Sequence, residues 1–464
     1  MSIASKSFTN KSVLIKWAIC IILTIICLVI PEQSFYTTQV KMFFAVTVFC
    51  LALSATELIP DFAIAILMPA LWVFFKVSDF ATVMSAWITP TMIMIAGAFV
   101  MAASLEHCGL LRRIAFYLMC KVNGNYFFLM LALMLVGILI NILTFGAAFV
   151  IVPAIAVGLC ASMNAIGTKF AAGLGAAAIL GCATSHSYTY MAASWGVINT
   201  MGAEYLKNNL ITPFDMMLHN WPMLIISIGI LFIAYLMYRP KDGIGDLAYF
   251  RRQLDAMGKI TQREKVNIAV LTLLILYVFT VQWTGLQMEL GFAIIPFLLY
   301  LPGINGATEE TLDKMNWKTL FFIASCMAIG TVATQLGLAE VLSELCLTLL
   351  NGNTNSMAIM AVVFAIVFLL NFLMTPMAIW SLLTVPLLSM AVNLGYNPVP
   401  FAYAVNACAE AILLPYEYVP YLVIYGFGLM RFKDFFVFNL VRSILVLGGI
   451  VVIMTGYWHL IGLF

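Results

Sequence analysis

Long apolar runs, separated by short polar stretches, occupy most of the chain. A helix that crosses the hydrocarbon core of a membrane needs about 20 apolar residues, and several runs have room for two spans or for a span and a re-entrant segment. The pattern therefore predicts an all-α polytopic membrane protein with about eleven transmembrane helices plus two re-entrant hairpins. The runs lie near residues 13–30, 42–54, 62–76, 125–161, 167–196, 221–238, 266–283, 289–302, 319–348, 357–393, 400–425 and 437–461.

One long polar stretch, residues 239–265, divides the chain almost in half. It holds seven of the 22 Lys and Arg residues, and loops rich in these residues stay on the cytoplasmic side of a membrane. We therefore expect a cytoplasmic basic linker between a first half, residues 1–238, and a second half, residues 266–464.

Basic residues near the two ends of the chain predict its orientation. Lys6, Lys11 and Lys16 place the N-terminus in the cytoplasm, which requires an even number of spans before the linker. Arg431 and Lys433 place the last loop inside, and hence the C-terminus on the periplasmic or extracellular side. About six spans followed by about five satisfy both conditions.

The composition excludes a water-soluble fold. Of the 464 residues, 64% are hydrophobic and only 9% are charged, against roughly 25% charged in an ordinary soluble domain. The net charge of +2 gives no reason to expect nucleic acid as a partner. The ten cysteines are scattered and form no C-x-x-C pair, so the sequence indicates neither a metal site nor a disulfide framework.

The second half repeats the pattern of the first. The segment Met92–Leu110 aligns with Leu320–Leu338 at an offset of 228 residues, and each ends in Gly-Leu. This repeat predicts one re-entrant hairpin at about 85–115 and a second at about 317–343.

Polar residues also recur at matched positions inside the apolar runs. The segment Asn141–Thr144 aligns with Asn371–Thr375, which predicts broken helices at about 141–153 and 371–386. Unsatisfied backbone is costly in lipid unless it lines a cavity, so these interruptions favour a transporter over a duplication that serves architecture alone. Repeats with an odd number of spans would be inverted relative to each other, as in many secondary transporters.

Glu417 lies in an apolar run with no Lys or Arg near it in the sequence. A charged side chain at that depth costs roughly 2.5 to 3.5 kcal/mol, so we expect it to have a use. Pro415 and Pro420 break the helix beside it, and the freed carbonyls with the carboxylate could form a proton or cation site. Glu410, earlier in the same run, is a second candidate for the coupling ion. A neutral Glu417 that only packs between helices is the structural alternative.

His186 lies in a polar cluster that aligns with the region of Glu417. A histidine there could bind a substrate carboxylate or relay a proton near neutral pH. For His186, as for the candidates named next, the structural alternative is a polar group that only holds helices together. The remaining candidates share uncharged amide or hydroxyl groups near the broken helix ends, suited to a substrate oxyanion and, for the threonines, a coupling ion: Asn141, Thr144, Asn371 and Thr375.

Four motifs follow one another along the chain: Thr56-Glu57-Leu-Ile-Pro60, Pro90–Arg113, Asn316–Leu338, and Pro415–Gly428 with its P-Y-E-Y-V-P start. They resemble, in order, the T-E-A-x-P segment, the two re-entrant hairpins and the P-x-x-T-P-P-N motif of the divalent anion:sodium symporter family. This family comprises sodium/dicarboxylate and sodium/sulfate transporters. The resemblance covers nearly the whole chain and implies a homodimer that works by an elevator-type movement.

Two S-N-T motifs of that family hold sodium and the substrate carboxylate. By position, Leu143-Thr144-Phe145 and Pro376-Met377-Ala378 take their places here, and neither is S-N-T. The resemblance implies that Thr144, Ser187 and Glu417 surround the substrate, while sodium and the proton both stay open as the coupling ion. An acid beside the substrate also admits a proton-coupled transporter of a zwitterionic or cationic solute.

We therefore expect a secondary active transporter that moves a small organic anion, a carboxylate or sulfonate, across the bacterial inner membrane by ion-coupled symport or exchange. A passive anion channel is an alternative, since the same polar groups would serve it. An enzyme is not expected, because no convergent nucleophile, base and oxyanion groups are evident. The expected partners are the anion, the lipid bilayer and a second copy of the chain, with no cofactor and no metal.

Overall fold

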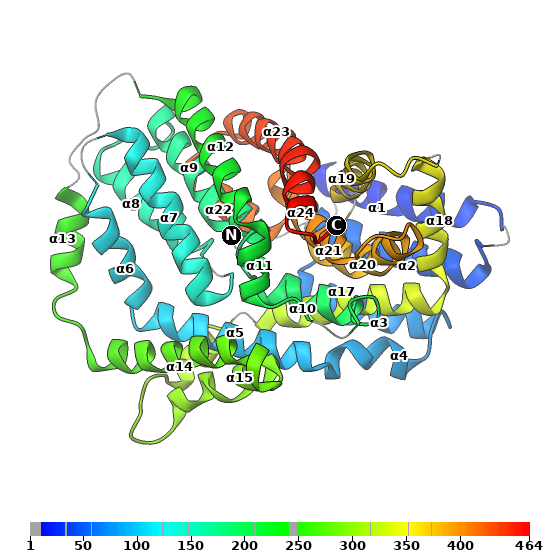
Figure 1. The fold of residues 1–464 in the computed structure, drawn as a ribbon, viewed down its shortest axis with the longest axis horizontal. Coiled ribbons are helices and arrows are strands. Elements are labelled where there is room, and N and C mark those ends of the chain that lie inside the picture. The colour runs from blue at the N-terminus through cyan, green and yellow to red at the C-terminus, as the bar shows by residue number, and fades with distance from the viewer. Residues whose placement is uncertain are drawn as a thin grey trace. The chain divides into compact units, whose positions relative to one another are not determined.

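Helices, joined by turns and short loops, make up the regular structure of the described residues (Figure 1). The structure, a computed structural model, describes residues 11–32, 35–56, 58–122, 125–146, 148–207, 210–240, 248–315, 317–350, 352–372 and 374–464. No strand occurs within these ranges, and the predicted all-α class is confirmed. Lys6, Glu57 and Asn316, and residues 241–247 of the predicted linker, lie outside these ranges.

The helices gather into two compact units. The first comprises Met1–Met92, Val197–Asn208 and Trp317–Val405, and the second comprises Ile93–Gly196, Asn209–Asn316 and Asn406–Phe464. Each unit takes segments from both halves of the sequence, so the units do not follow the halves on either side of the basic linker.

Helices α17 and α20 form the centre of the first unit and approach each other closely. A Cβ atom on Gly330 of α17 would lie 2.3 Å from the carbonyl oxygen of Ser381 in α20, so only glycine allows this contact. The helices of this unit are α1 (Lys11–Val29), α2 (Thr38–Ala55), α3 (Asp61–Phe74), α4 (Phe80–Met84), the 3-10 turn η1 (Ser85–Ile88), α17 (Trp317–Gln335), α18 (Leu338–Leu350), α19 (Ser356–Asn371) and α20 (Pro376–Asn393).

The second unit contains more helices than the first among the described residues. They are α6 (Leu110–Met119), α7 (Tyr126–Thr144), α8 (Ile151–Ser162), α9 (Lys169–Cys182), η2 (Thr184–Ser187), α11 (Pro213–Asn220), α12 (Pro222–Tyr238), α13 (Ala248–Ala256), α14 (Gln262–Thr284), α15 (Met288–Ile294), η3 (Pro296–Tyr300), α16 (Glu309–Asp313), η4 (Pro415–Glu417), α22 (Val419–Gly426), α23 (Phe432–Gly448), the π-helical turn η5 (Gly449–Met454) and α24 (Thr455–Leu460). Helices α5 (Pro90–His107), α10 (Ala192–Met201) and α21 (Val399–Ala409) have residues in both units.

Glycines also bring α7 and α9 together in the second unit. A Cβ atom on Gly181 would lie 2.5 Å from the carbonyl oxygen of Met134, and one on Gly137 would lie 2.8 Å from the carbonyl carbon of Gly181. Small residues at a helix interface let backbones approach closely, which is how helices gain packing energy in lipid.

Among the described residues, six helical segments are long and apolar enough to cross a membrane, and a seventh is the α11–α12 pair, bent by 60°. Their outward apolar side chains, such as Ile225 at 59% exposed, suit contact with lipid. Seven further apolar helices in these ranges have 10–17 residues, including α3, α8 and α21. The count of about eleven spans depends on how many of these shorter helices also cross, and it stays a prediction.

The helices stop at matched places in the two halves. Helix α7 ends at Thr144, and Phe145 and Gly146 have positive φ angles of 53° and 116° before α8 begins. Helix α19 ends at Asn371, and α20 begins at Pro376. Gly109 (φ 83°) precedes α6 and Gly337 (φ 71°) precedes α18, as expected for a residue type that adopts the left-handed conformation without strain.

Part of the basic linker is folded against the second unit. Helix α13 packs on α6, and the guanidinium of Arg113 donates to the carbonyl oxygens of Met257, Gly258 and Lys259. The same group pairs with the buried Glu264, at 2.6 Å from Nε to Oε1. Glu264 also accepts a hydrogen bond from the Thr261 backbone at the start of α14. Arg113 therefore joins three elements of this unit at one point.

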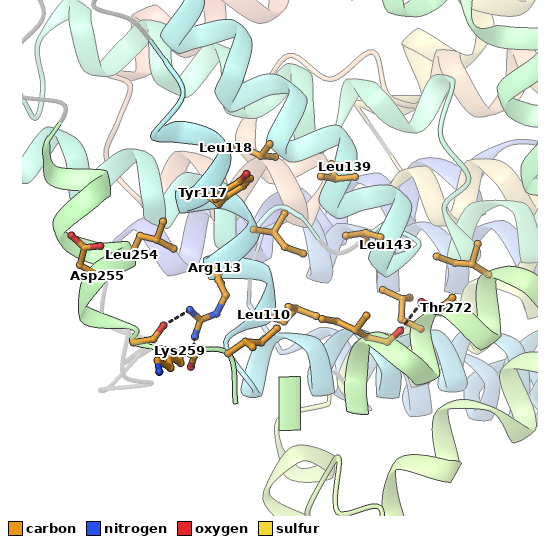
Figure 2. A pocket seen from close by; sticks show the side chains of 16 residues that line it. Leu110, Arg113, Tyr117, Leu118, Leu139, Leu143, Leu254, Asp255, Lys259 and Thr272 are labelled. Carbon is orange, nitrogen blue, oxygen red and sulfur yellow. Dashed lines mark hydrogen bonds between the residues drawn. The ribbon is translucent and has the colours of Figure 1, made fainter. Parts of the chain in front are cut away.

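An apolar groove of about 890 Å³ lies next to Arg113, among α6, α7, α14 and the linker (Figure 2). Leucine and isoleucine side chains form most of its lining, and Asp255 and Lys259 lie at the linker side. None of the candidate site residues predicted from the sequence lines this groove in the described part of the chain.

Candidate functional site

Two interruptions of helical structure meet in the second unit. Helix α9 ends at Cys182 and is followed by the single turn η2, while α21 ends at Ala409 and the chain stays non-helical until η4. Asn406, in the last turn of α21, donates to the carbonyl oxygen of His186 in η2 at 2.9 Å. This hydrogen bond links the two interruptions. Because broken helices leave backbone groups without helical partners, side chains must satisfy them here.

Arg442 of α23 supplies two of these partners. Its side chain is completely buried, and Nη2 donates to the carbonyl oxygens of Glu410 (2.9 Å) and Ile412 (3.0 Å). Nη1 donates to the hydroxyl of Thr184 at 3.2 Å, and Nε donates to Asn439 at 3.0 Å. The guanidinium carbon also lies 5.1 Å from the centre of the Tyr421 ring, within cation–π range.

His186 and Glu410 form a buried pair beside Arg442. His186 Nδ1 lies 3.2 Å from Glu410 Oε1, and the two side chains are 0% and 2% exposed. His186 Nε2 and Glu410 Oε2 are buried without a hydrogen-bond partner among the described residues. Unpaired buried polar atoms are costly, so these two atoms are the natural contacts for a proton, water or substrate atom.

Glu417 caps the same non-helical segment. Its carboxylate oxygens accept hydrogen bonds from the backbone N–H groups of Leu413 (3.1 Å) and Leu414 (3.0 Å). The carboxylate also interacts electrostatically with Arg442. The sequence shows no cation near Glu417, but folding brings one from α23. The predicted part of Glu417 and Glu410 in a proton or cation site stays a prediction.

Asn141 holds the break between α7 and α8 in place. Its Nδ2 donates to the carbonyl oxygen of Cys182 (2.9 Å) and to the Ser185 hydroxyl (2.8 Å), and its Oδ1 accepts from the Ala148 backbone (2.9 Å). These contacts give Asn141 a structural part in the unit. Its predicted contact with substrate stays a prediction.

The two predicted hydroxyl ligands of this unit donate hydrogen bonds to backbone carbonyls of their own helical turn. Thr144 donates to the carbonyl oxygen of Ile140, and Ser187 donates to that of Thr184, each at 2.7 Å. Each oxygen retains lone pairs that can accept a hydrogen bond or contact a cation. Thr144, Ser187, His186, Glu410 and Glu417 are all buried in this unit.

Asn371 and Thr375 belong to the first unit. They flank the break between α19 and α20, and Asn371 is 2% exposed. The Thr375 hydroxyl is buried and has no hydrogen-bond partner among the described residues. The structure thus places the eight predicted residues in two groups, six in the second unit and two in the first.

Arg442 is a residue of this cluster that the sequence motifs do not single out. It lies in an apolar run, Phe-Val-Phe-Asn-Leu-Val-Arg442-Ser-Ile-Leu, and the cost argument that singles out Glu417 applies to it equally. Among the described residues, no group of three or more His, Cys, Asp and Glu side chains could hold a metal ion.

Comparison with known proteins identifies the family of the chain. Residues 50–406 match the citrate transporter family, CitMHS. The L-tartrate/succinate antiporter of Escherichia coli strain K12 is 24% identical over 230 residues, which cover 48% of this chain and 46% of that protein. This match thus spans about half the length of the relative. The L-tartrate/succinate antiporter of E. coli strain UTI89 is 24% identical over 383 residues, 78% of this chain and 77% of that protein.

A solved structure has a similar fold. The crystal structure of the YdaH transporter of Alcanivorax borkumensis, described as having an unusual topology, matches with a TM-score of 0.53 and 14% identity. It covers 98% of this chain and 99% of that one. The family and these relatives are transporters and not enzymes, which agrees with the resemblance to divalent anion transporters seen in the sequence. Because the family match spans most of its length, the chain belongs to the citrate transporter family.

Proposed function

We propose that this protein is a secondary active transporter that moves a small carboxylate across the bacterial inner membrane and couples this movement to protons. The observation that carries the proposal is the buried cluster of His186, Glu410, Glu417 and Arg442 at two interrupted helices. Membership in a citrate transporter family and the names of the E. coli relatives support a carboxylate as the substrate class.

The net charge of the cluster supports the proton as the coupling ion. Two carboxylates and one guanidinium leave one negative charge in a region of low dielectric, where an uncompensated charge is expensive. One proton on His186 or on a carboxylate makes the cluster neutral. The unpartnered His186 Nε2 and Glu410 Oε2 are positions from which a proton or water can reach it.

Substrate and proton are then linked through charge. A carboxylate substrate near the cluster adds negative charge and strengthens the binding of a proton, and linkage requires that the proton strengthen the binding of the substrate equally. Among the described residues, the phenols of Tyr418 and Tyr421 also interact electrostatically with Glu410.

The resemblance seen in the sequence supports the wider mechanism that we propose. It comprises two inverted repeats, a homodimer, elevator-type movement, a cytoplasmic N-terminus and a periplasmic C-terminus. The matched breaks after Thr144 and Asn371, and the matched glycines 109 and 337, support the repeats. Sodium coupling and pure anion exchange are the competing mechanisms.

Transport by purified protein in liposomes tests the proposal. Uptake of radiolabelled succinate, tartrate and citrate is measured with a pH gradient, with a sodium gradient, and with unlabelled anion inside. We expect accumulation above the external concentration, driven by the pH gradient and abolished by a protonophore. Flux that never runs uphill would indicate a channel, and uptake that needs only internal anion would indicate obligate exchange. No flux of any of these anions would overturn the carboxylate assignment.

A further inference from the structure

We infer that Arg442 is a resident cation that takes the place of an exchangeable metal ion at the interrupted segment 410–417. This inference rests on the proposed transport function for its meaning, but its main test does not depend on transport. Carbonyls freed by interrupted helices in transporters commonly coordinate sodium. Here the corresponding carbonyls, those of Glu410 and Ile412, bind a guanidinium.

The ligands of the guanidinium are the kind that sodium would use. They are two backbone carbonyl oxygens and the Thr184 hydroxyl, with the Asn439 amide oxygen on the fourth side. All are neutral oxygens, and hard cations prefer oxygen ligands of this kind. The carboxylate of Glu417 interacts electrostatically with Arg442 and supplies opposite charge.

Arg442 is a permanent cation at this place. Arg442 is 0% exposed, and a guanidinium cannot lose its proton at physiological pH. It is covalently part of α23 and is held by four hydrogen bonds and the Tyr421 ring. A sodium ion at this place could enter and leave during a transport cycle, whereas Arg442 cannot. The proton on the His186–Glu410 pair is then the exchangeable charge of this cluster.

The hydrogen bonds of Arg442 also explain how residues 411–414 keep an irregular backbone. Residues 411–414 have no regular structure although they are buried or nearly so. Without Arg442, the Ile412 carbonyl would lose its side-chain donor in a region that excludes water. The Glu410 carbonyl also accepts from the backbone N–H of Ile412, at 2.9 Å. Tyr421 also donates to the Glu410 carbonyl, at 3.2 Å, whereas the Ile412 carbonyl takes its side-chain donor from Arg442. Arg442 therefore positions this segment in addition to balancing its charge.

Replacement of Arg442 by Ala, in the full-length purified protein, tests this inference. Thermal unfolding is followed at constant ionic strength in choline chloride, sodium chloride or methylguanidinium chloride. We expect the R442A protein to melt at a lower temperature than the wild type, and we expect methylguanidinium to restore part of this difference. Sodium should raise the melting temperature of R442A more than that of the wild type, because the emptied carbonyl site can accept it.

Two further variants keep the test decisive if R442A does not fold. Arg442→Lys retains the charge but cannot reach all four acceptors, and we expect it to fold with uptake reduced at least about tenfold. Arg431→Ala, which removes an exposed arginine just before the same helix, is the matched control and should behave as the wild type.

Three results would overturn the inference. The first is wild-type uptake by an Arg442→Gln protein. The second is a sodium effect on melting temperature that is the same in R442A and the wild type, together with no effect of methylguanidinium. The third is an R442K protein with the same melting temperature and the same uptake as R442A. Failure of carboxylate uptake by the wild type would remove the proposed function but leave the stability test of Arg442 intact.

Discussion

His186 Nδ1 lies 3.2 Å from Glu410 Oε1, although the two residues are 224 positions apart in the sequence. Both side chains are buried, and the second polar atom of each is without a hydrogen-bond partner in the described part of the chain. A half-satisfied buried pair is unstable unless another group completes it. This pair is therefore the first place at which the proposed coupling can be tested.

Glu410→Gln should reduce pH-driven uptake at least about tenfold, because an amide keeps the size of the carboxylate but cannot carry the proton. The dependence of the remaining uptake on pH should become flat. Both quantities are measured in liposomes between about pH 5 and 8. Glu344→Gln, on an exposed position of α18, is the control. A steep pH profile in E410Q would exclude Glu410 from coupling.

Glu417→Ala should destabilise the protein, because the Leu413 and Leu414 N–H groups lose their acceptors. The expected cost is about 1–3 kcal/mol for each buried donor left unpaired. Glu417→Gln keeps one carbonyl oxygen and should lie between E417A and the wild type in melting temperature. If Glu417 also carries the coupling proton, E417Q loses proton-linked uptake while it stays folded. Equal melting temperatures for all three proteins would contradict the capping role.

Gly181→Ala should separate α7 from α9, because the added methyl group would lie 2.5 Å from the Met134 carbonyl oxygen. Overpacking of this kind costs about 1–3 kcal/mol, which a lower temperature of thermal unfolding would report. Gly448→Ala, in α23, is the control, since nothing lies within 4 Å of its added methyl group. A helical Gly-to-Ala change in open space should be neutral or stabilising. Equal effects at both positions would argue against the close packing.

Arg113→Ala should release the linker from the second unit, because it removes a buried ion pair and three contacts to linker carbonyls. Breaking a buried pair costs roughly 3 kcal/mol. Limited proteolysis should then cut near residues 257–259 faster than in the wild type. Arg112→Ala, which removes the exposed neighbouring arginine, is the matched control. Unchanged cleavage in R113A would mean that other contacts hold the linker.

Much of the fold follows from local features of the sequence. Apolar runs require helices in lipid, because each backbone N–H must find its partner within its own segment. The breaks near Thr144, Asn371 and Glu417 are similarly local, since they depend on prolines, glycines and polar residues at given positions. The number of spans is harder to predict, because several apolar helices have only 10–17 residues and length alone does not say whether they cross.

The candidate site can be predicted only in part. An ionisable side chain in an apolar run is expensive wherever the fold places it, so Glu410, Glu417 and His186 stand out from the amino-acid pattern alone. Their partners do not, because a hydrogen bond depends on atoms that meet in space and not on positions along the chain. Packing of α23 against the interrupted segments brings Arg442 to the carbonyls of Glu410 and Ile412, and it places a cation near the buried Glu417 carboxylate.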